Sequence, residues 1–179
     1  GVELLGACDV RTRFTDAAEV FGPQKGASDA HIRLLTGRLE RLVQVYEERY
    51  GVDISAMDRA GAAGGLAGGL AARGAQLVDG VDLVAEEVRL DEHLAGADLV
   101  VTGEGRLDAT SMAGKVVGGV AAYAAAAGVP LLVVVGSADP DVIVPGDVLS
   151  LVDLFGLDRA QTDTGTCVTE AVAGWLAGR

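Results

Sequence analysis

The densest group of polar side chains in the chain follows a short apolar run at residues 97–102. Seven polar residues lie within positions 102–115: Thr102, Glu104, Arg106, Asp108, Thr110, Ser111 and Lys115. Gly103 and Gly105 lie between them and let the backbone turn and present its N–H groups. The carboxylates could hold a metal ion, and the cations and N–H groups could donate to a phosphate or a carboxylate. The alternative is a solvated strand-to-helix loop in which Asp108 or Thr110 caps the following helix.

Two common phosphate-binding motifs do not fit this loop. Gly114-Lys115 is followed by Val116 instead of Ser or Thr, which argues against a Walker A loop. Gly103-x-Gly105 is followed by Asp108 where the dinucleotide fingerprint requires Gly or Ala. The sequence therefore disfavours an NAD-linked oxidoreductase.

Two further segments carry candidate binding residues. Lys25 and Gln24 stand beside a predicted helix start, where a lysine could bind an anionic substrate; the alternative is a turn with Lys25 merely exposed. The glycine-rich segment 61–69, which holds Gly64 and Gly65, could bring a helix amino terminus to a ligand. Its alternative role is close packing of a helix on a sheet.

Asp9 follows a predicted strand, where a carboxylate could act as a base or a metal ligand. The neighbouring Cys8 is more typical of a small buried hydrophobe than of a reactive thiol. His31 and His93 are typical of surface residues on helices. The chain has no Gly-x-Ser-x-Gly motif, so nothing indicates a serine hydrolase.

The clearest helical pattern begins after Ser28, a good N-cap, and ends before Gly51. Residues 11–26 show no sustained period and are predicted to be irregular and exposed. The other expected elements are a strand over 2–10, a weak helix over 59–75, helical pieces over 81–90 and 91–95, a strand over 97–102, a helix and a strand within 113–135, a strand over 148–153 and a helix over 164–176. This alternation predicts an α/β fold with parallel-sheet, Rossmann- or flavodoxin-like layers and helices on both faces.

Composition excludes several classes of protein. The net charge of -12 would repel nucleic acid, and two cysteines without metal-ligand spacing argue against a disulfide scaffold or a structural zinc site. Residues 116–138 carry no charge, but Gly128-Val129-Pro130 divides them into a helix and a buried strand rather than a membrane span. We expect no membrane association and, because no secretory signal is evident, a cytoplasmic protein.

Four motifs occur in an order that resembles the glycerate kinase family, whose members phosphorylate glycerate with ATP. They are Ala7-Cys8-Asp9-Val10, Val20-Phe21-Gly22-Pro23-Gln24-Lys25-Gly26-Ala27, Gly61-Ala62-Ala63-Gly64-Gly65-Leu66, and the run from Ala97 to Asp108 with Gly114-Lys115 and Gly128-Val129-Pro130. The chain departs from the family at residues 11–16, where an Asn-Pro-Leu stretch is usual, and at Thr110-Ser111, where a Gln-Thr pair is usual.

The family also has an amino-terminal Asp-Ser-Phe-Lys-Gly motif and a later Asp-Gly-Gly motif, and this chain contains neither. The resemblance therefore implies the carboxyl-terminal half of a two-domain kinase. Residues 1–94 would be the latter part of an inserted α/β domain, and residues 95–179 the carboxyl-terminal part of a flavodoxin-like domain. We expect such a chain to be dimeric or to depend on a missing amino-terminal half.

The resemblance implies glycerate as the substrate, with ATP and Mg²⁺ as cofactors. It places catalytic roles on four residues and cofactor-binding roles on six more: Asp9, Glu104, Arg106 and Asp108 for catalysis, and Lys25, Gly64, Gly65, Gly103, Gly105 and Lys115 for binding. Asp9 or Asp108 would be the base or a metal carboxylate, and Asp108 and Glu104 the metal ligands. The alternatives are a non-catalytic module that binds a nucleotide or small acid, and a truncated gene product without a role of its own.

Overall fold

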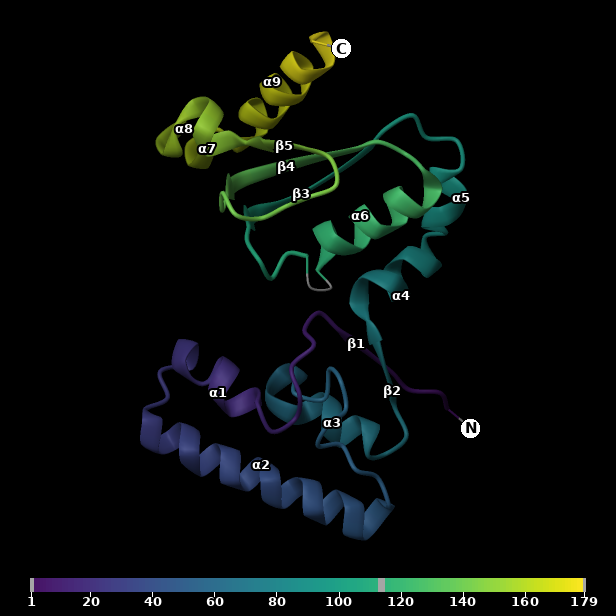
Figure 1. Cartoon of the computed structure of the whole chain (residues 1–179), viewed down its shortest axis with the longest axis vertical. Helices are drawn as coiled ribbons and strands as arrows, with labels where there is room; N and C mark the ends of the chain where they lie inside the picture. The colour runs from purple at the N-terminus through teal and green to yellow at the C-terminus, as the bar shows by residue number, and fades with distance from the viewer. Residues whose placement is uncertain (1, 113–114, 179) are drawn as a thin grey trace. The chain divides into compact units, whose positions relative to one another are not determined.

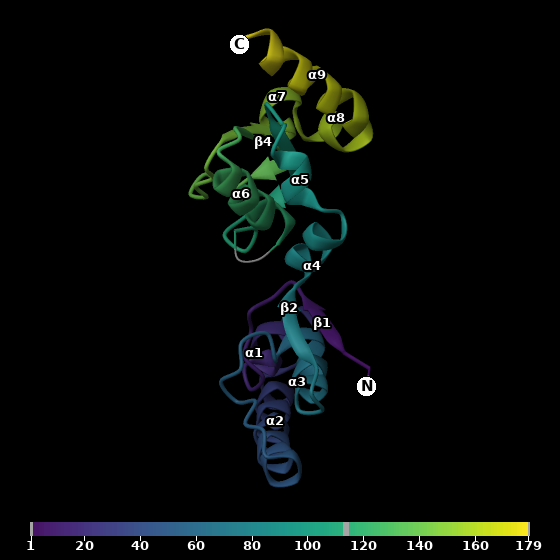
Figure 2. The ribbon, with the colours of Figure 1, turned by 90° about the vertical axis from the view of Figure 1, so that its right-hand side faces the viewer.

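The computed structural model describes residues 2–112 and 115–178, and the chain divides into two compact units, Gly1–Leu83 and Val84–Arg179. Each unit contains its own parallel sheet with helices around it (Figure 1). The turned view in Figure 2 shows the same elements from the side. The predicted α/β class with parallel strands is therefore confirmed.

The first unit holds a two-stranded parallel sheet and a long helix. Its elements are β1 (Leu5–Cys8), α1 (Ala17–Phe21), a 3-10 helix (Pro23–Lys25), α2 (Asp29–Tyr50), a second 3-10 helix (Ala62–Gly65), α3 (Leu66–Ala71) and β2 (Gln76–Asp79); α4 (Gly80–Glu87) follows β2 directly. The strands pair in register from Leu5 with Gln76 to Cys8 with Asp79. Both strands therefore end at the same edge, at Asp9 and Asp79.

Helix α2 has the predicted limits. The hydroxyl of Ser28 accepts a hydrogen bond from the backbone N–H of His31, and Gly51 ends the helix in the left-handed conformation with φ of 67°. The pattern predicts an apolar stripe of Ile32, Leu35, Leu39, Leu42 and Tyr46. Of these, Leu39 and Tyr46 pack against the core of the unit together with Val43, whereas Leu35 and Leu42 are exposed.

The prediction of an irregular, exposed segment at residues 11–26 is wrong. Phe14 is 1% exposed, Ala17 and Ala18 are buried, and the segment contains α1. A five-residue helix is too short to show a helical period, which explains the error. The ring of Phe14 packs closely against Gly65 and Gly68, since a Cβ added to either glycine would collide with it. These two glycines therefore serve close packing.

Two further predictions in this unit need correction. Residues 59–75 do not form one helix, because residues 63–65 adopt left-handed backbone angles and only Leu66–Ala71 is α-helical. Strand β2 was not predicted at all, because four residues after a glycine-rich stretch carry too little pattern.

The second unit holds the parallel sheet β3-β4-β5. Its elements are α5 (Leu90–Leu94), β3 (Val100–Leu107), α6 (Val116–Ala127), β4 (Leu131–Ala138), β5 (Asp147–Ser150), α7 (Leu151–Phe155), α8 (Leu157–Thr162) and α9 (Thr164–Ala177). Val133 and Val135 of the central strand pack toward α6, and Leu132 and Val134 pack toward α7, α8 and α9. Figure 1 shows α6 on one side of the sheet and α7, α8 and α9 on the other. Helices therefore cover both faces of this sheet, as predicted.

Three sequence expectations in the second unit can be compared directly. The helix and buried strand within 113–135 and the terminal helix are confirmed as α6, β4 and α9. The first strand continues to Leu107, so Glu104 and Arg106 lie on a strand instead of a loop. The strand predicted over 148–153 ends at Ser150, whose hydroxyl accepts a hydrogen bond from the Asp153 N–H and starts α7. Within residues 2–112 and 115–178, no helix combines the length and apolar character needed to cross a membrane.

We expect Phe14→Ala to lower the free energy of unfolding by about 3–5 kcal/mol, because it leaves a cavity in the core of the first unit. The control is Val20→Ala on α1, since Val20 is 52% exposed and its truncation is expected to change stability by at most about 0.5 kcal/mol. Urea unfolding followed by circular dichroism measures both. Equal stability of the two variants would contradict the packing described for residues 11–26.

Candidate functional site

Asp79, at the carboxyl end of β2, lies between two arginines. Arg59 donates to it through Nε and Nη2, at 3.0 and 2.6 Å, and Arg11 donates through Nη2 at 2.9 Å. The side chains of Arg59 and Asp79 are only 16% and 13% exposed. Asp58 accepts from both arginines on the solvent side, so two acids and two bases balance in charge.

This network shifts the titration of its members. The hydrogen bonds and positive charge of Arg59 hold the pKa of Asp79 below its ordinary value, and Asp79 raises the pKa of Arg59. Burial raises the pKa of the Cys8 thiol, in line with its role as a small buried residue. Asp79 is therefore ionised at neutral pH and serves as a fixed partner for Arg59.

Sequence reasoning missed both Arg59 and Asp79. Strand β2 was not recognised, so the placement of Asp79 at the sheet edge beside Asp9 could not be seen. Arg59 has a φ of 69°, a conformation that favours glycine, and its pairing with Asp79, 20 residues away, offsets the cost of an arginine there. The sequence contained one signal, the Asp58-Arg59 pair directly before the glycine-rich motif.

Asp9 lies beside this network with a free carboxylate. The side chain is exposed, and within the described residues no group donates a hydrogen bond to it. Its Oδ1 lies where a Cβ on residue 80 would stand, 2.5 Å away, so glycine at position 80 makes room for it. An exposed, unpaired carboxylate at the carboxyl end of a strand is available to a ligand.

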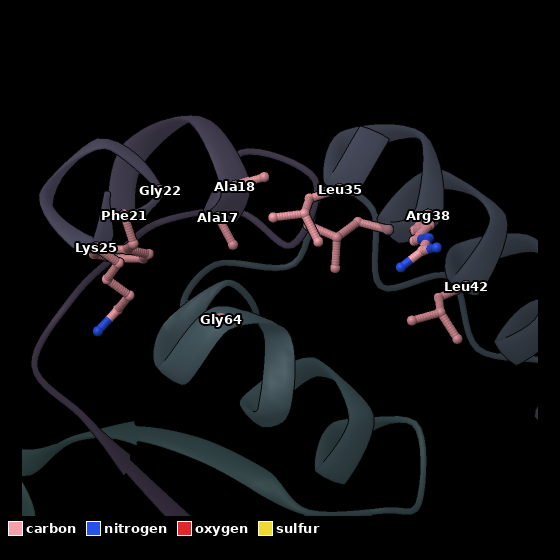
Figure 3. Close-up of a pocket in the computed structure, with 10 residues that line it drawn as sticks. Ala17, Ala18, Phe21, Gly22, Lys25, Leu35, Arg38, Leu42 and Gly64 are labelled. Atoms are coloured by element: carbon pink, nitrogen blue, oxygen red, sulfur yellow. The ribbon is translucent and has the colours of Figure 1, made fainter. Parts of the chain in front are cut away.

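Lys25 and Gly64 line one pocket, together with residues of α1 and α2 (Figure 3). Gly64 has a φ of 69°, and a Cβ there would meet nothing within 4 Å, so its surface is open to a ligand. Gly65 also has a positive φ but faces the Phe14 ring. The structure therefore brings Lys25 and Gly64 together and gives Gly65 a packing role.

At the end of β3, Asp108 is held by its neighbours. Its Oδ1 accepts from the N–H and the hydroxyl of Thr110, at 2.8 and 2.6 Å, and Lys115 donates to the same hydroxyl at 2.6 Å. The buried hydroxyl of Ser111 accepts from the Asp108 N–H at 3.0 Å. The Thr110 hydrogen bonds, with smaller contributions from Lys115 and Arg106, lower the pKa of Asp108. Neither Asp108 nor Thr110 caps α6, whose N-cap is Lys115, so the predicted capping role is wrong.

Glu104 and Arg106 lie on β3 with different surroundings. Arg106 pairs with Asp139, just beyond β4, at 2.9 Å, and both side chains are largely exposed. Glu104 is in register with Val135, on the face of the sheet that packs against α6. Its Oε1 is buried, and no donor among residues 2–112 and 115–178 satisfies it. Gly114, which the sequence analysis paired with Lys115, lies outside the described residues.

The two candidate glycines of β3 differ in the same way as Gly64 and Gly65. A Cβ on Gly103 would collide with the backbone carbonyl of Val134 on the neighbouring strand, whereas a Cβ on Gly105 would meet nothing within 4 Å. Gly103 is therefore required by the sheet, and Gly105 is open to a ligand. A cavity of about 350 Å³ also lies at this sheet edge, lined in part by Asp139, Ser150 and Asp153.

The donor set of the second unit fits a magnesium ion in part. Mg²⁺ takes oxygen ligands and commonly uses one or two protein carboxylates besides water and phosphate oxygens. The unsatisfied Oε1 of Glu104 is such an oxygen, and the second oxygen of Asp108 is not engaged by Thr110. In the part of the chain that the structure describes, no three Asp, Glu, His or Cys side chains come together as a metal site.

Comparison with known proteins gives these features a context. The model of the glycerate kinase family matches residues 1–172. The chain belongs to the glycerate kinase family. It is 43% identical over 140 residues to a glycerate kinase of Halalkalibacterium halodurans and 41% identical over 140 residues to the glycerate 2-kinase of Escherichia coli K12. Each alignment covers 76% of this chain and 37% of the relative.

The fold agrees with that of a solved family member. A crystal structure of a Salmonella typhimurium LT2 protein assigned as glycerate kinase 2 matches with a TM-score of 0.68 and 36% identity. The match covers 98% of this chain and 49% of the Salmonella chain. The chain thus spans between about a third and a half of the length of these glycerate kinase relatives.

Replacing Asp79 by Asn is expected to lower the free energy of unfolding at pH 7 by about 2–3 kcal/mol, because Arg59 loses its charged partner. The pKa of Asp79 is depressed in the fold, so its contribution is complete above its ordinary value of 3.8 and disappears as the pH falls through the folded pKa. Urea unfolding between pH 7 and pH 3 measures the free energy of unfolding of wild type and variant. We expect the difference between them to shrink only at the acid end of this range.

The matched control for that experiment is Glu47→Gln, which removes an exposed acid of α2. Glu47→Gln should change the free energy of unfolding only slightly, and this change should not depend on pH in the acid range. A pH-independent gap for Asp79→Asn would contradict the ionic role of Asp79.

The glycines of β3 give a second paired test. Gly103→Ala is expected to cost about 2 kcal/mol, because β3 and β4 must separate around the new methyl group. Gly105→Ala is expected to change stability by at most about 0.5 kcal/mol. Thermal unfolding of both variants measures the difference, and a destabilised Gly105→Ala would refute an open surface at Gly105.

Proposed function

We propose that this chain is part of a glycerate kinase that transfers the γ-phosphoryl group of ATP to a hydroxyl group of glycerate. The match of residues 1–172 to the family model carries the proposal. The identity of 41–43% to proteins named as glycerate kinases supports it. A small organic acid as substrate and a cytoplasmic location belong to the same proposal.

The reaction requires a base, because the attacking hydroxyl of glycerate loses its proton as the new P–O bond forms and the bond to ADP breaks. Asp9 suits this role, since its exposed carboxylate has no hydrogen-bond donor within the described residues. Asp108 suits it less well, because its lowered pKa makes it a weaker base. We therefore assign proton removal to Asp9.

Asp108 and Glu104 are proposed to hold Mg²⁺, which would neutralise charge on the phosphates. The pKa of Asp108, lowered by Thr110, keeps the carboxylate ionised, as a metal ligand must be. The unsatisfied Oε1 of Glu104 is the second available oxygen.

Three cations are proposed as donors to phosphate or to the substrate carboxylate: Lys25, Arg106 and Lys115. Arg106 and Lys115 lie with Asp108 at the end of β3, and their present partners, Asp139 and Thr110, keep them extended there. Gly64 and Gly105 would let the ligand approach the backbone, because a Cβ at either position would point into open space. Positioning and charge neutralisation of this kind supply most of the rate in phosphoryl transfer.

The division into residues 1–94, from an inserted domain, and 95–179, from a flavodoxin-like domain, is part of the proposal. The presence of two compact units supports a division of this kind, although the units meet between Leu83 and Val84, 11 residues before the proposed boundary. A chain that matches 37–49% of its relatives' length is expected to need the remaining part for turnover.

The test is glycerate-dependent release of ADP from Mg-ATP by the purified chain, with and without the missing portion of a full-length relative. We expect turnover only when the two are combined. Turnover by the chain alone would show that the site lies within these 179 residues. Nucleotide or glycerate binding without turnover in either case would favour the non-catalytic module.

In the complemented enzyme, Asp9→Asn is expected to lower kcat by about 10²- to 10⁴-fold, the range for loss of a general base. Asp108→Asn is expected to raise the Mg²⁺ concentration needed for half-maximal rate more than Asp9→Asn does. Glu19→Gln, an exposed acid of α1, is the control. An Asp9→Asn enzyme with unchanged kcat would remove Asp9 as the base.

A further inference from the structure

An apolar pocket of about 340 Å³ lies in the first unit between α1, α2 and the loop at Gly64 (Figure 3). Its floor and walls are the side chains of small and aliphatic residues together with Phe21: Ala17, Ala18, Leu35, Leu39 and Leu42. The α2 contribution follows the spacing i, i+4, i+7, so one face of the helix supplies it. Leu35 and Leu42 are 41% and 38% exposed, so this apolar surface is open to solvent.

The charge of the pocket is opposite to that of the protein. The chain carries 26 acidic and 14 basic residues, yet the pocket is lined by Lys25 and Arg38 and by no acid. Within residues 2–112 and 115–178, neither cation forms an ion pair or a side-chain hydrogen bond, so no acid of the described chain neutralises it. Figure 3 shows Lys25 at one end of the pocket and Arg38 with Leu42 at the other.

A second cavity adjoins the first at the Lys25 end. It has a volume of about 540 Å³ and shares Phe21, Lys25 and Gly64 with the apolar pocket. Its remaining lining includes the amide side chain of Gln24 and no acid. Lys25 thus lies between the apolar pocket and the second cavity. A charged group in the second cavity would meet the Lys25 ammonium, the Gln24 amide and the backbone at Gly64.

We propose that the apolar pocket holds the base of the nucleotide, with Arg38 at the edge of the base and Lys25 on the side of the phosphates. The proposal rests on the proposed function, which gives the protein two substrates, ATP and glycerate. Glycerate is small and polar and has too little apolar surface for such a pocket, whereas a nucleotide joins a flat ring to a polyanion. A guanidinium group can stack on the ring or donate to its acceptor nitrogens.

The test measures binding of metal-free ADP to the 179-residue chain by calorimetry, and locates it by the shifts of backbone amide resonances. Adenosine and inorganic pyrophosphate are the two partial probes. We expect ADP and adenosine to shift amides of α1 and α2, because both carry the base. Lys25→Ala is expected to weaken ADP about tenfold and to leave adenosine nearly unchanged, since it removes one charge-assisted contact to phosphate.

Two matched pairs on α2 keep the test specific. Leu35→Asp puts a carboxylate into the pocket, and Leu34→Asp puts the same charge on a neighbouring side chain that is 53% exposed and does not line it. Arg38→Ala removes the pocket arginine, and Arg33→Ala removes an arginine of α2 outside the pocket. We expect at least tenfold weaker ADP binding for Leu35→Asp and Arg38→Ala and no change for the two controls.

Four results would overturn the assignment. The first is that the chain does not bind ADP, and the second is that Leu35→Asp and Leu34→Asp bind ADP equally well. The third is that ADP shifts only the amide resonances of residues 100–115, and the fourth is that the chain forms a dimer that Leu35→Asp abolishes. The proposed function is judged separately: ADP bound in the pocket without turnover in the complemented enzyme removes the kinase proposal alone. Turnover with an unchanged KM for ATP in Leu35→Asp removes the pocket assignment alone.

Discussion

The packing of the Phe14 ring against backbone decides how the first unit brings its candidate residues together. The ring lies against Gly65 and Gly68, and the Arg13 carbonyl lies where a Cβ on Gly61 would stand. These contacts join the segment that carries Lys25 to the loop that carries Gly64. Larger side chains at the three glycines would force the two segments apart. The glycine-rich motif is therefore a packing surface along most of its length, with Gly64 as the open position.

Prediction from the sequence succeeded where an element was long or strongly patterned. Helix α2 has a cap, a stripe and a terminal glycine, and β4 is a run of buried aliphatic residues after a Gly-Val-Pro turn. Strand β2 and helix α1 have four and five residues, which is too few to establish a period. Their existence depends on tertiary contacts, with β1 in one case and with the Phe14 core in the other.

The same limit explains what could be predicted about the candidate site. Asp9, Asp108 and Lys25 could be named as candidates because each stands in or next to a motif beside a recognisable element. Arg59 and Asp79 were missed because their partnership depends on the pairing of β2 with β1. Gly103 and Gly105 look alike in the sequence, and only the position of the Val134 carbonyl separates a structural glycine from an open one.

The basic residues of this acidic chain differ in whether an acid neutralises them. Arg11, Arg59, Arg106 and Arg159 are each bound to an aspartate or glutamate, which fixes their direction and cancels their charge locally. The two cations that line the apolar pocket have no ion pair within the described residues, and no acid lines that pocket. A polyanion approaching a protein of net charge -12 meets attraction only where such local departures exist.

The left-handed backbone at Arg59 makes the turn before the glycine-rich motif depend on the formation of strand β2. A non-glycine residue in this conformation is unfavourable by itself, and its compensation is a partner that arrives 20 residues later in the chain. The turn before the glycine-rich motif therefore gains its contact with Asp79 only when β2 is in place. The conformation of this turn is thus coupled to completion of the β1–β2 sheet.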